Sequence, residues 1–162
     1  MKLTFVKLTF ATMAVCLVGS AALAGGVMPA DVKFEEGGAV TTSLSGMPGD
    51  PASGAEIMAA KSRGNCVACH EITALADTPF HGEVGPVLDG AGSRWNEEQL
   101  RGLVTDAKMT FDDSLMPSFY KVTGFVRPGD AYTGKAAEGE LAPLLSAQEI
   151  EDVVAFLMTL KD

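Results

Sequence analysis

The chain has 162 residues, a length that supports one domain of ordinary size. Apolar residues make up 47% of it and charged residues 20%, which is typical of a globular protein and excludes a disordered chain or a protein with many membrane spans. The 12 basic and 21 acidic side chains leave a formal net charge of -9. This charge argues against a nucleic-acid partner, because that role needs a basic surface to neutralise phosphates.

The first 24 residues have the pattern of a cleaved secretory signal. Lys2 and Lys7 are basic, an uncharged apolar stretch runs over residues 8–23, and residues 22–24 read A-L-A, like a processing site. A retained membrane anchor is the alternative, although the apolar stretch is shorter than the ~20 residues that a spanning helix needs. We expect an exported protein with no membrane segment after cleavage. Its formal charge is then -11, because cleavage removes two lysines and no acid.

Cleavage also removes Cys16 and leaves two cysteines, Cys66 and Cys69, with His70 directly after them. Residues 66–70 read C-V-A-C-H, the attachment motif of c-type haem, in which two thiols bond to the porphyrin and the imidazole lies under the iron. A disulfide or a redox-active pair is the alternative, but a redox pair is expected within a βαβ pattern, and no strand-rich stretch precedes this motif. We therefore predict one covalently bound haem c, attached through Cys66 and Cys69, with His70 as an axial iron ligand.

Met116 is the predicted second axial ligand. Pro117 follows it, and a proline there stiffens the backbone and removes an N–H donor that would need a partner beside the haem. Met109 is the nearest competitor in sequence, and His81 is the chemical competitor, although it follows His70 too closely for an easy crossing to the opposite haem face. Ligation by His and Met fills the iron coordination, which favours electron transfer over catalysis, so no catalytic residue is predicted in this chain.

The N-terminal part of the mature chain is expected to form an arm followed by a helix. Residues 25–49 are rich in Gly, Ser and Thr, which predicts an extended arm, with a disordered leader as the alternative. Asp50 and Pro51 are typical of a helix start, since the first can cap the helix and the second suits its first turn. We expect this helix to continue through Lys61 and to stop near Gly64, directly before the haem motif.

The region after the motif predicts a loop and a second helix. Residues 85–88 form a loop in which a backbone carbonyl could accept the free N–H of His70. Residues 96–99 resemble a capping box, and an apolar stripe at helical spacing starts at Leu100. Trp95 precedes this helix and is either a donor to a haem propionate or a core residue.

Residues 116–145 show no helical period, because Gly and Pro interrupt them, so we expect a long loop with a functional or partner-binding role. Residues 146–149 form a second capping box, and apolar residues at helical spacing over 150–160 predict the clearest amphipathic helix of the chain. The sequence thus predicts an all-α fold of the class I cytochrome c type, with residues 50–162 as the cytochrome c domain.

Four runs resemble the SoxX family, the monohaem cytochrome subunit of the SoxAX complex, from about Gly49 to Lys161. The runs are residues 64–70 (GNCVACH), 85–95 (GPVLDGAGSRW), 116–121 (MPSFYK) and 145–157 (LSAQEIEDVVAFL). The haem motif and the Met-Pro pair alone fit many class I cytochromes. The other runs make the resemblance more selective.

The resemblance implies a periplasmic protein that takes part in the oxidation of thiosulfate. It implies a heterodimer with SoxA, the subunit that joins thiosulfate to a cysteine of the carrier SoxYZ. It also implies a downstream cytochrome c as electron acceptor. The arm and the loop at 121–145 are then candidates for the SoxA interface. The L-cysteine S-thiosulfotransferase activity would belong to the complex, because this chain retains no cysteine beyond the two of the motif.

Two other functions are weighed against this one. A free periplasmic electron shuttle would use the same haem ligands. A peroxidase with two haems would need a second C-x-x-C-H motif, which the sequence lacks.

Overall fold

The computed structural model describes residues 26–129 and 133–162. The predicted signal at 1–24, including Cys16, lies outside the described residues, as does the first residue of the arm. In the part of the chain that is described, all regular structure is helical apart from one isolated bridge between Gly129 and Ala136. The α-helices are α1 (Pro51–Ala59), α2 (Ala91–Arg94), α3 (Glu97–Asp106) and α4 (Ala147–Thr159), and short 3-10 helices cover Pro29–Asp31, Cys66–Ala68, Thr73–Leu75 and Ala107–Met109. The predicted all-α fold is confirmed.

The starts of the helices follow the predicted caps. Asp50 accepts a hydrogen bond from the backbone N–H of Ala52 at the start of α1. Asn96 begins α3 and Ser146 begins α4, each with both hydrogen bonds of a capping box. These side chains satisfy backbone N–H groups that the first turn of a helix leaves without partners.

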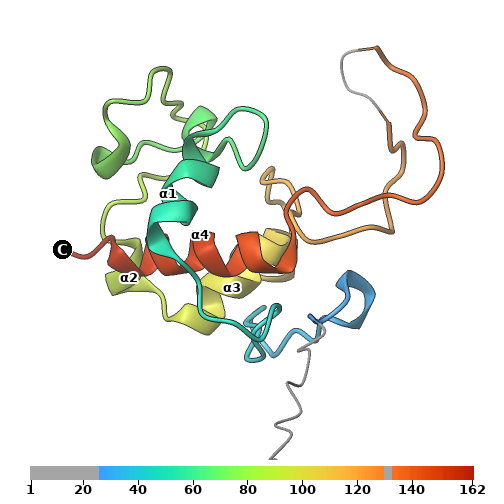
Figure 1. The fold of residues 1–162 in the computed structure, drawn as a ribbon, viewed down its shortest axis with the longest axis horizontal. Coiled ribbons are helices and arrows are strands. Elements are labelled where there is room, and N and C mark those ends of the chain that lie inside the picture. The colour runs from blue at the N-terminus through green and yellow to red at the C-terminus, as the bar shows by residue number, and fades with distance from the viewer. Residues whose placement is uncertain (1–25, 130–132) are drawn as a thin grey trace, which may run out of the picture.

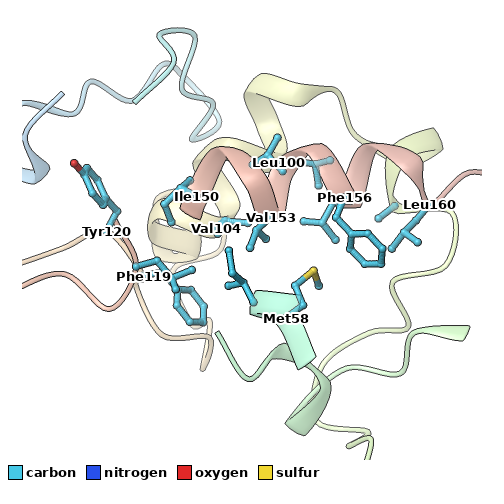
Figure 2. Packing of buried hydrophobic residues seen from close by; sticks show 14 of the residues in the cluster. Met58, Leu100, Val104, Phe119, Tyr120, Ile150, Val153, Phe156 and Leu160 are labelled. Atoms are coloured by element: carbon cyan, nitrogen blue, oxygen red, sulfur yellow. The ribbon is translucent and has the colours of Figure 1, made fainter. Parts of the chain in front are cut away.

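Helix α1 lies across α4 with the two backbones in contact (Figure 1). A side-chain carbon added at Gly54 would lie 2.0 Å from the backbone oxygen of Asp152 and 2.9 Å from Cβ of Phe156, so only glycine allows this approach. Met58 reaches from α1 toward Val153 and Phe156 of α4, as Figure 2 shows. This crossing forms the centre of the hydrophobic core.

The prediction that the first helix continues through Lys61 to Gly64 is wrong, because α1 ends at Ala59. The chain turns instead, with the N–H of Gly64 donating to the backbone oxygen of Ile57 at 3.1 Å. Asn65 then adopts a left-handed conformation, with φ of 50°. This turn is held to the C-terminal end of α1, where the N–H of Asn65 donates to the backbone oxygen of Ala60 at 3.1 Å, and it leads directly into the haem motif.

The arm packs on its own chain along α3 and α4. Val40 and Leu44 are fully buried, and the N–H of Leu44 donates to Glu151 at 2.6 Å. Arg101 is also buried. Its Nε donates to Glu151 at 3.0 Å, and its Nη1 donates to the backbone oxygen of Val40 at 2.9 Å. The hydroxyl of Tyr120 donates to the backbone oxygen of Val27 at 2.6 Å, and in Figure 2 it turns toward the arm.

The predicted long loop is present. Between Met116 and the start of α4 no described residue is helical, and the chain from about residue 122 swings away from the helices in Figure 1. Most of its described side chains are exposed, including Val126 and Leu144, whereas Leu145 is buried and its N–H donates to the backbone oxygen of Phe119 at 3.0 Å. After it leaves the helices at about residue 122, the loop therefore returns to the core only at Leu145.

Replacing Gly54 by alanine tests the helix crossing. An alanine normally stabilises a helix interior by about 1 kcal/mol relative to glycine. Here we expect Gly54→Ala to lower the free energy of unfolding by about 1–3 kcal/mol, because the added carbon forces α1 and α4 apart. Glu56→Ala, at an exposed position of the same helix, is the matched control. Thermal unfolding gives the melting temperature of each variant. A melting temperature for Gly54→Ala at or above that of the wild type would contradict the close crossing of α1 and α4.

Candidate functional site

The haem motif forms one tight helical turn. Cys66 to Ala68 are a 3-10 helix, and the N–H groups of Cys69 and His70 both donate to the backbone oxygen of Cys66, at 3.1 and 3.0 Å. Residues three and four positions apart on such a turn share one side. Both cysteines and the histidine accordingly line the same cavity.

That cavity has a volume of about 830 Å³ and largely apolar walls. Its volume lies within the range of about 300–1,000 Å³ that is typical of ligand and cofactor sites. Every main helix contributes to the wall: Met58 from α1, Ala91 from α2, Leu100, Leu103 and Val104 from α3, and Val153 and Leu157 from α4. A large, flat and mainly apolar ring fits a cavity of this size and lining.

The thiols of the motif suit covalent attachment better than redox cycling. Cys66 and Cys69 are not joined by a disulfide. Burial raises the pKa of the Cys66 thiol to about 12, whereas redox-active cysteines have a lowered pKa. In the described part of the chain no group of three His, Cys, Asp or Glu side chains is placed to hold a bare metal ion. Two free thiols on one helical turn of the cavity wall are the donors that a haem bound through two thioethers requires.

The predicted acceptor for His70 is present in the loop at 85–88. Nδ1 of His70 lies 2.7 Å from the backbone oxygen of Pro86, so this nitrogen carries the proton and Nε2 is left without one, as a metal ligand would need. Such a hydrogen bond fixes the tautomer and the orientation of a ring that ligates a metal. The loop itself is fixed by Arg94, which donates to the backbone oxygens of Asp89 at 2.7 Å and Val87 at 3.1 Å.

Two glycines pack directly against the motif. A side-chain carbon at Gly85 would lie 2.3 Å from Cε1 of His70, and one at Gly82 would lie 2.0 Å from the backbone oxygen of Ala68. The N–H of Gly85 also donates to the backbone oxygen of Cys69 at 2.7 Å. The chain thus closes over the imidazole only because these positions lack side chains.

Met116 lines the cavity, whereas neither alternative ligand does. The side chain of Met109 is about half exposed at the end of its 3-10 helix. The ring of His81 is held by its own loop, because Nδ1 accepts from the N–H of Ile72 at 3.3 Å and Nε2 lies 3.1 Å from the backbone oxygen of Leu75. The structure therefore brings Cys66, Cys69, His70 and Met116 to one cavity and leaves Met109 and His81 outside it.

Some side chains at the site were not singled out from the sequence. Lys61, Arg63 and Arg94 line the cavity and place basic groups in its wall. Asp106 lies beyond the wall, at the base of the Met116 loop, where Ser118 donates to it. Trp95, for which two roles stayed open, lines the cavity and meets Phe111 edge-on, with ring centroids 6.3 Å apart.

In the residues that the structure describes, no helix is long and apolar enough to cross a membrane.

Comparison with known proteins agrees with the architecture of the site. Residues 51–161 match the cytochrome c family. The solved structure of SoxXA from P. pantotrophus contains a chain that is 58% identical and superposes with a TM-score of 0.80, covering 85% of this chain and 99% of that one. A search of curated protein sequences gives no significant match. The chain belongs to the cytochrome c family, and its similarity to SoxXA agrees with the resemblance to the SoxX cytochromes within that family.

Membership of this family implies a covalently bound haem c, and the cavity fits it. When bound, the haem iron supplies a one-electron change of oxidation state. The residues of this chain supply the apolar wall, the candidate attachment thiols and the candidate axial ligands.

A substitution at Gly85 tests how closely the chain packs on His70. We expect Gly85→Ala to displace the imidazole, because the added carbon would lie only 2.3 Å from Cε1, closer than two unbonded carbon atoms can approach. The covalent haem should remain, while the fraction of six-coordinate low-spin iron falls. Disturbing the groups that orient a metal ligand typically lowers metal affinity or activity by roughly 10–100-fold. Absorption spectroscopy measures this fraction. Glu83→Ala, an exposed neighbour, is the control, and equal spectra for the two variants would contradict the predicted displacement.

Proposed function

We propose that this chain is an electron-transfer cytochrome in which Cys66 and Cys69 bind haem c through thioethers, and His70 and Met116 are the axial iron ligands. The observation that supports this most directly is the convergence of these four side chains on one apolar cavity. Two protein ligands leave no open position for a substrate, so the site is suited to passing electrons and not to binding a reactant.

The residues around the cavity favour electron transfer with little rearrangement. The hydrogen bond from His70 to Pro86 holds the imidazole in one orientation. Apolar side chains from α1, α3 and α4 exclude water from the cavity, which reduces the reorientation of solvent that a change of charge would require. A thioether ligand such as Met116 favours the ferrous state and raises the reduction potential.

We further propose that the chain forms a heterodimer with a SoxA subunit, after export to the periplasm and cleavage of residues 1–24. The 58% identity to a chain of SoxXA supports this partner. The remaining sequence would then divide into the arm at 25–49 and the cytochrome c domain at 50–162. The arm already packs on its own α3 and α4, so it would offer SoxA an outer surface of this chain.

In that complex the chain would accept electrons from SoxA during the oxidative joining of thiosulfate to a cysteine of the SoxYZ carrier. Forming the new sulfur–sulfur bond from a thiol and thiosulfate releases two electrons and one proton. Because one haem c would supply a one-electron change, the chain would pass these electrons singly to another cytochrome. The L-cysteine S-thiosulfotransferase chemistry would take place on SoxA, because Cys66 and Cys69 are committed to the haem.

The ligand assignment is tested by replacing each candidate methionine in turn. We expect Met116→Ala to abolish the sulfur-to-iron charge-transfer band of the ferric protein and to lower its reduction potential, because the soft ligand is lost. Met109→Ala, a matched loss of a half-exposed methionine outside the cavity, should change neither. An unchanged band in Met116→Ala would overturn the assignment.

Co-purification tests the SoxA partnership against a free shuttle. We expect the tagged full-length chain, isolated from its native host, to elute in a one-to-one complex with a SoxA-type cytochrome at physiological concentration. Size-exclusion chromatography with haem staining measures this. Elution as a monomer alone would favour the free shuttle and would leave the haem ligation proposed above unaffected.

A further inference from the structure

Asp106 lies at the last residue of α3 and is almost completely buried, at 6% exposure. Its carboxylate accepts hydrogen bonds from the hydroxyl of Ser118 at 2.6 Å, from Nζ of Lys121 at 3.1 Å and from the backbone N–H of Lys108 at 3.3 Å. Two of these donors come from the loop that begins at Met116. The carboxylate thus ties that loop to the end of α3.

Further hydrogen bonds join the same two segments. Nζ of Lys108 donates to the backbone oxygen of Met116 at 2.8 Å, and the N–H of Tyr120 donates to the backbone oxygen of Thr105 at 3.2 Å. The loop is therefore held at four positions between Met116 and Lys121. Asp106 is the one acidic group among these contacts.

The carboxylate of Asp106 is held in its ionised form. Burial by itself would raise its pKa, but the hydrogen bonds from Ser118 and Lys121 outweigh burial and lower the pKa. An ionised acceptor makes stronger hydrogen bonds than a neutral one. Losing the charge would therefore weaken both bonds to the loop at once.

We propose that Asp106 is a positioning residue for Met116: by anchoring Ser118 and Lys121, it keeps the loop closed and controls how readily the thioether leaves the haem iron. This inference rests on the proposed function, in which Met116 is an axial ligand. Asp106 does not touch the cavity, and it would act only through the loop.

The test compares Asp106→Asn with Asp113→Asn in the haem-loaded full-length chain. Both substitutions neutralise one carboxylate near Met116, but Asp113 is exposed on the segment before the loop. Imidazole is the probe, since it binds ferric iron only when the methionine dissociates. We expect Asp106→Asn to raise the apparent affinity for imidazole about tenfold and to weaken the sulfur-to-iron band, while Asp113→Asn matches the wild type.

Two further variants separate positioning from general destabilisation. Leu44→Ala, a fully buried residue of the arm that does not line the cavity, should lower the melting temperature and leave imidazole affinity unchanged. Ser118→Ala removes one of the two loop donors and should give an effect in the same direction as Asp106→Asn but smaller. Equal imidazole affinities for Asp106→Asn and Asp113→Asn would overturn the inference, as would a rise in Leu44→Ala as large as that in Asp106→Asn.

The outcome is distinguishable from failure of the proposed function. If Met116 is not a ligand, the wild type lacks the sulfur-to-iron band and Met116→Ala has the imidazole affinity of the wild type. If Met116 is a ligand but Asp106 does not position it, the wild type shows the band, Met116→Ala binds imidazole tightly, and Asp106→Asn behaves as the wild type.

Discussion

The close contact between α1 and α4 at Gly54 is the constraint on which the rest of the structure depends. Because a glycine faces the backbone of Asp152, the two helices approach until their main chains touch, and Met58 reaches the apolar face of α4. The chain leaves α1 at a fixed place and turns directly into the haem motif. The crossing therefore helps to set the position of Cys66 relative to Val153 and Leu157 of α4, which line the same cavity.

The two proposed axial ligands are supported in different ways. Pro86 contacts His70 itself by accepting its N–H, and Gly85 leaves room for the ring. Asp106 and Lys108 do not contact the Met116 side chain, and they act on it only through the loop that carries it. On both sides a charged side chain fixes the supporting loop, because Arg94 holds the loop at 85–88. The orientation of Met116 thus depends on contacts one step further from the proposed ligand than that of His70.

Much of the fold could be predicted because its signals are local. The capping boxes at Asn96 and Ser146 and the haem motif at 66–70 each lie within a few consecutive residues, and the structure has helices where the caps predicted them. The acceptor loop for His70 was also predictable, since it follows the motif closely. The end of α1 was not, because the turn after Ala59 depends on a hydrogen bond back to Ile57.

What escaped prediction depends on residues far apart in the sequence. Arg101 and Glu151 are charged residues on helices, where the usual expectation is an exposed position. Both are buried because each satisfies the other and because together they bind the backbone of the arm at Val40 and Leu44. Removing one partner of such a pair leaves an uncompensated buried charge, at a cost of about 3–5 kcal/mol. No local pattern in the sequence marks such a pair.

The net charge of the whole chain does not describe the local charge around the cavity. Lys61, Arg63 and Arg94 line the cavity, although acidic residues outnumber basic ones in the whole chain. Arg63 pairs with Glu149, and Arg94 is fixed by backbone oxygens. Exposed charges more than about 8 Å apart are largely screened at physiological ionic strength. A molecule that approaches the cavity therefore meets the positive charges of Lys61 and Arg94 at short range, while Glu149 offsets that of Arg63. The acidic remainder of the surface acts only on its longer approach at low salt.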